Sequence, residues 1–69
     1  MKYEFKLKER YRGLNIWYEK YNCIVEEKLF DYTKKKYDSF CSLNKDDRIE
    51  YVVLINLLDD DGEFVRVVQ

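Results

Sequence analysis

The chain has 69 residues and a formal net charge of −1; 46% of its residues are hydrophobic, 17% are aromatic, and it contains no histidine and no proline. A chain of this length supports one small domain, so we expect a single domain over residues 1–69. Histidine is the usual base of nucleophilic triads and the commonest metal ligand. Its absence argues against an enzyme and against a bound metal or cofactor, and we expect a non-catalytic protein.

The N-terminal segment alternates between apolar and charged side chains. Tyr3, Phe5 and Leu7 alternate with charged residues through KYEFKLK, which predicts a strand with one buried face. Arg12-Gly13 is a candidate turn. The segment is charged where a signal peptide needs an apolar core, and no apolar run in the chain is long enough to cross a bilayer. We therefore expect a cytoplasmic protein with no membrane partner.

The stretch LNIWYEKYNCIV, residues 14–25, fits two structures. Its apolar side chains recur at the three- and four-residue spacing of a helix, yet Trp17, Tyr21, Cys23 and Val25 would also share one face of a strand. The high aromatic content and the nearby Gly13 favour a strand.

The next segment, EEKLFDYTKKKYDSFCSLN, predicts an amphipathic helix over residues 26–44. Two glutamates at its start suit the positive end of the helix dipole, and Asn44 is a candidate stop. The apolar stripe of this helix consists of Leu29, Phe30, Thr33, Tyr37, Phe40 and Cys41.

The C-terminal segments RIEYVVLINLL and EFVRVVQ flank DDDG, which predicts a β-hairpin with two conceivable registers. A two-residue turn would place Leu57 opposite Arg66 and mix polar with apolar side chains on both faces. A three-residue loop with a left-handed Gly62 builds one continuous apolar face, and we favour it. The preferred register pairs Leu58 with Phe64, Leu57 with Val65, Asn56 with Arg66 and Ile55 with Val67.

Together these elements predict an α+β fold: a small antiparallel sheet, in the order β-β-α-β-β, with one helix packed on one face. One helix cannot cover both faces of the hairpin. The second face is too apolar to be left to water, which favours a homodimer or a partner protein on that face. It carries Val52, Leu54, Leu58, Phe64 and Val68 around Asn56 and Arg66.

None of the remaining motifs predicts chemistry. Cys23 and Cys41 are too far apart for a redox pair and are expected to be reduced, with a single disulfide as the alternative. The acidic groups, including DDDGE, lie in expected turns and lack the ligand spacing of a calcium loop.

Nucleic-acid binding is an alternative function. Residues 1–12 carry five basic against two acidic residues, and Lys34–Lys36 follow in the helix. Basic side chains beside aromatic ones can hold single-stranded nucleic acid. The expected burial of Tyr3 and Phe5 and the acidic pI weigh against this alternative.

The aromatic surplus and the missing catalytic groups favour a small protein-binding module. The size and the Lys/Tyr/Asp/Asn-rich composition are similar to those of small proteins that low-GC bacteria and their phages use to block host or defence enzymes. We therefore expect an inhibitor or adaptor that occludes a surface of a larger macromolecule. The predicted contact residues are Leu58, Asp59, Asp60, Asp61, Phe64 and Arg66 on the hairpin, with Trp17, Tyr18 and Tyr21.

Overall fold

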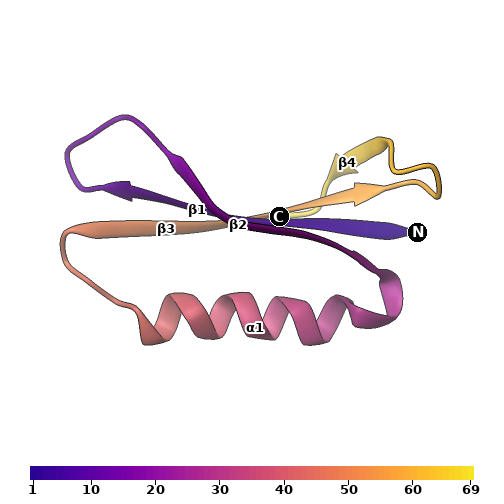
Figure 1. Ribbon diagram of the computed structural model, residues 1–69, viewed down its shortest axis with the longest axis horizontal. Coiled ribbons are helices and arrows are strands. Elements are labelled where there is room, and N and C mark those ends of the chain that lie inside the picture. Colours follow the sequence, from indigo (N-terminus) through magenta and orange to yellow (C-terminus); the bar gives the residue numbers. More distant parts are fainter.

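The computed structural model describes residues 1–69 and consists of one antiparallel sheet with one helix on one face (Figure 1). The α+β fold predicted from the sequence is confirmed. Residues 18–26 form a strand rather than a helix, and residues 14–17 belong to the preceding loop. The elements are β1 (Lys2–Tyr11), β2 (Tyr18–Glu26), a 3-10 turn η1 (Glu27–Leu29), α1 (Phe30–Leu43), β3 (Ile49–Leu58) and β4 (Phe64–Val67).

The strand order in the sheet is β2-β1-β3-β4, so the N-terminal strand lies in the middle. Every second side chain of β1 faces the helix, which accounts for its alternating pattern. Phe5 lies opposite Cys23 on one side and Ile55 on the other, and Leu7 lies opposite Val53. Phe5, Leu7, Val53 and Ile55 form the buried cluster of the core.

Aromatic rings of α1 cover this cluster. The Phe5 ring centroid lies 5.5 Å from that of Phe30 and 5.4 Å from that of Tyr37. Phe40 contacts Tyr51 edge to face at 5.6 Å. The helix ends at Leu43 with Asn44 as its cap, as expected: the Asn44 backbone N–H and side-chain amide both donate to the Phe40 carbonyl, at 3.0 and 2.9 Å. Its predicted start at residue 26 is wrong, because Glu26 still pairs in β2 and residues 27–29 form η1. With 14 residues and three consecutive lysines, α1 is neither long nor apolar enough to cross a membrane.

The C-terminal hairpin has the predicted three-residue loop. Gly62 has a φ of 84°, Leu58 lies opposite Phe64, and the Asp59 N–H donates to the Glu63 carbonyl at 2.9 Å. Beyond that pair the predicted register is wrong. Leu57 lies opposite Arg66 and Asn56 opposite Val67, because Val65 is an extra residue that forms a bulge. Such a bulge bends and twists an edge strand, and all of β4 is exposed.

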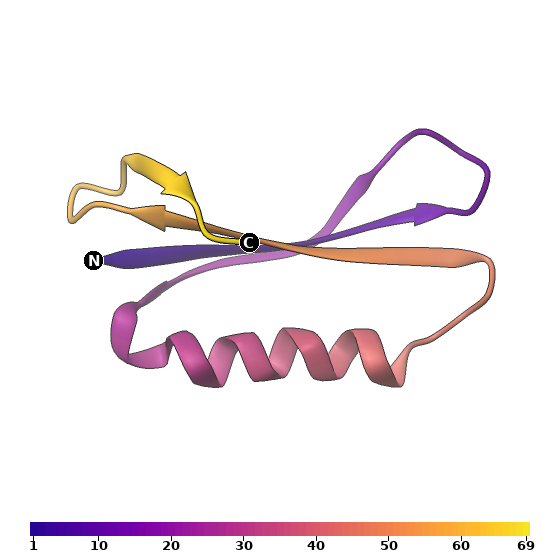
Figure 2. The ribbon, with the colours of Figure 1, turned by 180° about the vertical axis from the view of Figure 1, so that it is seen from behind.

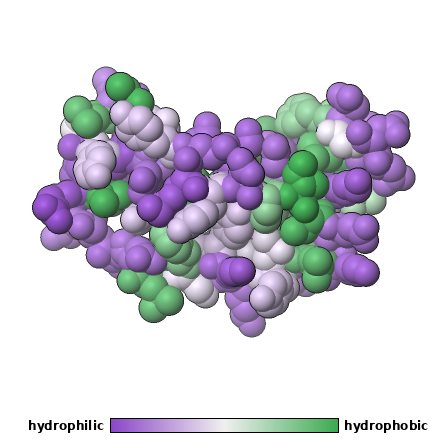
Figure 3. Space-filling view, in the orientation of Figure 1, coloured by the Kyte–Doolittle hydropathy of each residue, from purple (hydrophilic) through white to green (hydrophobic).

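The face of the sheet opposite α1 forms a saddle between two raised ends (Figures 1 and 2). One end is the loop between β1 and β2, and the other is the hairpin of β3 and β4. Figure 3 shows the dip between them lined mainly by hydrophilic side chains. Five of the six charged residues of β1 lie on this face, all except Glu9, and Val52 and Leu54 beside them are half-buried. The second face is therefore less apolar than the hairpin sequence alone suggested.

Candidate functional site

The residues predicted as contacts fall into two separate groups. Trp17 and Tyr18 lie at the β1–β2 end of the molecule, whereas Phe64 and Arg66 lie at the hairpin end (Figure 1). Phe64 is 60% exposed and Arg66 is also exposed, as expected. Leu58 was expected on the surface but is only 4% exposed: it is the last residue of β3 and lies between Lys2 of β1 and Phe64 of β4. The structure does not join these residues into one surface.

The acidic hairpin tip is partly used by the turn itself. One carboxylate oxygen of Asp59 accepts hydrogen bonds from the backbone N–H groups of Asp61 and Glu63, at 3.0 and 2.9 Å. Asp60 lies 3.1 Å from the N-terminal ammonium of Met1. The chain contains no cluster of three acidic or cysteine side chains that could hold a metal ion.

Trp17 is held by a neighbouring cation. The Arg10 guanidinium lies 4.6 Å from the centre of the Trp17 ring and donates to Glu50 at 2.8 Å. A cation over an indole face is a favourable electrostatic contact. This arrangement fixes the loop end and leaves the Trp17 ring only partly exposed.

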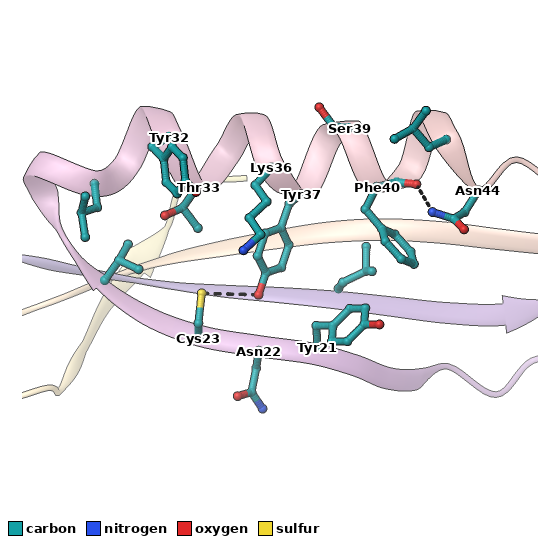
Figure 4. Close-up of a pocket in the computed structure, with 14 residues that line it drawn as sticks. Tyr21, Asn22, Cys23, Tyr32, Thr33, Lys36, Tyr37, Ser39, Phe40 and Asn44 are labelled. Atoms are coloured by element: carbon teal, nitrogen blue, oxygen red, sulfur yellow. Dashed lines mark hydrogen bonds between the residues drawn. The ribbon is translucent and has the colours of Figure 1, made fainter.

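A groove of ≈ 860 Å³ lies between β2 and α1 (Figure 4). Sequence reasoning missed it, although Tyr21, one of its lining residues, was predicted as a contact. Most of its lining is apolar, and Lys36 is its only charged side chain. The lining consists of Leu7, Tyr21, Asn22, Cys23, Val25, Leu29, Tyr32, Thr33, Lys36, Tyr37, Ser39, Phe40, Leu43 and Asn44.

One wall of the groove is a row of side chains on η1 and α1, beside the stripe that faces the core. Leu29, Tyr32 and Leu43 share this row with Lys36, at spacings of three, four and seven residues. Tyr32 is 67% exposed and Leu43 is 83% exposed. Leu29, which the helical stripe placed in the core, is exposed as well. Single exposed apolar residues are ordinary, but several exposed apolar side chains that border an apolar groove mark a candidate contact surface.

Tyr37 and Cys23 line the groove, whereas Cys41 lies on α1 outside its lining. The Tyr37 hydroxyl donates to the Cys23 sulfur at 3.4 Å. Burial and this hydrogen bond raise the pKa of Tyr37 above its ordinary value, and burial raises the pKa of the Cys41 thiol. Both cysteines are free, as expected. A raised pKa disfavours the thiolate or phenolate that a nucleophile needs.

Comparison with protein family models, with curated proteins and with solved structures found no match. The geometry of the groove and of the two ends is therefore the basis for a functional proposal.

Proposed function

We propose that this chain is a non-catalytic protein-binding module, an adaptor or inhibitor that acts by occupying a surface of a larger macromolecule. The observation that carries the proposal is the apolar groove between β2 and α1, with Tyr32 and Leu43 exposed on its rim. Protein grooves that take a segment of a partner are concave and lined by apolar side chains. The groove has these properties, whereas the hairpin tip, where the sequence placed most of the contacts, is convex and acidic.

Catalysis is disfavoured by the chemistry of the same groove. Its titratable side chains are three tyrosines, one cysteine and one lysine, and it contains no carboxylate that could act as a base. General acid–base catalysis needs a proton acceptor within hydrogen-bond reach of the substrate. A binding role requires only the apolar surface that is present.

Nucleic-acid binding is disfavoured because most of the basic strand is neutralised by neighbouring acids. Lys6 lies 4.0 Å from Glu4 and 3.9 Å from Glu19. Arg10 and Arg12 both approach Glu50, at 2.8 and 3.8 Å. Phosphate binding depends on cations that are free to replace the counterions of the nucleic acid, and these cations already have carboxylate partners.

The proposal is tested by co-purification of tagged protein from cells of its source organism, comparing two substitutions. Tyr32→Asp places a charge in the groove, and Phe64→Asp places the same charge on the exposed hairpin. Both side chains are well exposed, so both variants are expected to stay folded. We expect wild-type protein to retain a stoichiometric protein partner, Tyr32→Asp to lose it at least tenfold, and Phe64→Asp to keep it.

Two results would count against this proposal. If wild-type protein retains no stoichiometric partner, the chain is not a protein-binding module under the conditions of its cell. If Phe64→Asp loses the partner and Tyr32→Asp keeps it, the hairpin is the contact surface. Sedimentation across a dilution series identifies the remaining case, in which the partner is a second copy of the same chain.

A further inference from the structure

We propose that the groove takes an extended peptide segment of the partner, which adds to the open edge of β2 as a fifth strand. The segment would place apolar side chains in the groove at alternate positions and a carboxylate near Lys36. This inference rests on the proposed function and specifies its binding mode. Strand addition combines backbone hydrogen bonds, which supply affinity, with pockets for alternate side chains, which supply specificity.

The first observation is the open edge of β2. This strand is nine residues long, lies at the end of the sheet order and pairs only with β1. Native edge strands are commonly shortened, covered or interrupted by proline. None of these protections is present in β2, although a bulge opposite Leu7 and Lys8 bends the strand near its start. Residues 21–26 beyond that bulge are regularly paired and remain available to another strand.

The hydrogen-bond pattern identifies which backbone groups face the open edge. The N–H and the carbonyl of Ile55 both bond to Gln69, away from β1. Backbone groups alternate in direction along antiparallel strands. Phe5, which lies opposite Ile55, therefore directs its groups toward Cys23, and the neighbouring residues Asn22 and Ile24 direct theirs outward. These two residues supply the donors and acceptors for an added strand.

Side chains alternate along β2 as well, and every second one points toward the groove. Tyr21, Cys23 and Val25 line it, whereas the Asn22 side chain points away from α1 in Figure 4. The helical wall extends from Leu29 to Leu43, which is about 21 Å at 1.5 Å per residue. At about 3.4 Å per residue, an extended segment of roughly six residues covers this length.

Lys36 indicates which charge is favoured on the bound segment. Its side chain reaches from α1 toward β2 beside Tyr37 (Figure 4), and it has no acidic partner within 4 Å, whereas the neighbouring Lys34 is paired with Asp38 at 2.8 Å. A free cation above an apolar groove favours an acidic group on the occupant. A second copy of this chain fits less well, because its β2 would present Tyr21, Cys23 and Val25 on the groove side, and none of these is acidic.

The probes are synthetic N-acetylated, C-amidated heptapeptides with threonine at odd positions and groove-facing residues at even positions. One set has valine, leucine or phenylalanine at positions two and six with glutamate at position four; the matched set has lysine at position four. Binding to isotope-labelled full-length protein is followed by NMR titration, and protection of the Asn22 and Ile24 amides by hydrogen exchange. We expect glutamate peptides to bind at least about threefold more tightly than lysine peptides and to protect both amides.

Paired variants test the backbone and the charge separately. Ile24→Pro removes an outward N–H at a position where an edge strand tolerates proline, and Ile24→Ala keeps that N–H while removing the same side chain. We expect only Ile24→Pro to lose peptide binding, at least tenfold. Lys36→Glu should reverse the preference toward lysine peptides, whereas Lys35→Glu, which makes the same charge change outside the groove lining, should not.

Three results would overturn strand addition. The first is that no heptapeptide binds. The second is binding that leaves the Ile24 amide unprotected and is equal for Ile24→Pro and Ile24→Ala. The third is that the wild-type chain forms a dimer and that Ile24→Pro dissociates it, because a second copy of the chain would then occupy the groove. If the peptides fail while Tyr32→Asp still loses the cellular partner, the groove binds a folded surface, so the proposed function stands and this inference falls.

Discussion

At the scale of single residues, a few polar groups complete the backbone hydrogen bonding at the ends of elements. Asn44 donates two hydrogen bonds to the carbonyl of Phe40 at the end of α1. Asp59 accepts two backbone N–H groups in the hairpin loop, and Gly62 supplies the positive φ that this loop needs. Backbone groups without such partners are costly, so these residues have structural roles that the composition alone does not reveal.

The role of Asp59 predicts a difference between neighbouring aspartates. Asp59→Ala leaves two N–H groups of the loop without their acceptor and should lower the free energy of unfolding by about 1 kcal/mol. Asp60→Ala removes only an exposed ion pair with the N-terminus and should cost less than about 0.5 kcal/mol. Urea denaturation of both variants measures the difference. Equal effects would mean that the carboxylate of Asp59 does not stabilise the loop.

Tyr37 predicts a dependence of stability on alkaline pH. Burial, followed by the hydrogen bond to Cys23, raises its pKa in the folded state above the ordinary value of 10.0. The folded state therefore holds this proton more tightly than the unfolded state, so the associated stability is complete below pH 10 and falls as the pH rises beyond it. Tyr37→Phe should show a smaller loss of unfolding free energy between pH 9 and 11 than the wild type. Parallel pH profiles for the two proteins would contradict this assignment.

At the scale of elements, the edge strands behave differently from the central pair. β1 and β3 pair over their full lengths, whereas β4 contains a bulge at Val65. The N–H groups of Val68 and Gln69 both donate to the Ile55 carbonyl, at 2.7 and 3.1 Å, which marks a second irregularity. These irregularities bend the hairpin away from the helix. β2 also has a bulge near its start, but its residues 21–26 pair regularly and keep an open outer edge beside the groove, so the two edges of the sheet are not equivalent.

Buried and exposed positions of the hairpin should contribute unequally to stability, so two truncations there should lower the free energy of unfolding by different amounts. Val53→Ala removes buried methyl groups from the core cluster and should lower the free energy of unfolding by about 1–2 kcal/mol. Phe64→Ala truncates a side chain that is 60% exposed and should cost less than half as much. Chemical denaturation of both variants measures this ratio. Equal costs would show that Phe64 belongs to the core in solution.

At the scale of the whole molecule, the core is small and depends on a few side chains. Only Phe5, Leu7 and Ile55 are almost fully buried among the large side chains. A chain of this length is expected to have a free energy of unfolding of roughly 3–10 kcal/mol. The other aromatic residues of the core pack around Phe5 and remain partly exposed.

Phe5 is therefore the residue whose loss should affect the entire fold. Phe5→Ala should cost about 3–5 kcal/mol and leave a substantial fraction of the molecules unfolded at 25 °C. Phe5→Leu keeps most of the volume and should remain folded. Amide dispersion in NMR spectra and near-ultraviolet circular dichroism distinguish the two variants. A fully folded Phe5→Ala would place the centre of the core elsewhere.

Local sequence patterns predicted the type and order of the helix and strands, and which side chains of the sheet are buried on one face. The alternation around Phe5 predicted β1, the apolar stripe predicted α1, and the position of Gly62 predicted the hairpin loop, because each pattern follows from the local periodicity of a strand, helix or turn. Aromatic content and the nearby Gly13 favoured a strand over a helix for residues 14–25, and the structure has a strand over residues 18–26. No long-range information was needed for these features.

The existence of the groove follows only from the tertiary structure. Whether Tyr32 and Leu43 are exposed depends on where α1 lies across the sheet, and the open side of β2 depends on the strand order. The bulge at Val65 and the burial of Leu58 likewise depend on how the hairpin bends against the rest of the sheet. Local periodicity predicts which face of an element is apolar, but contacts between distant segments decide which apolar faces are covered.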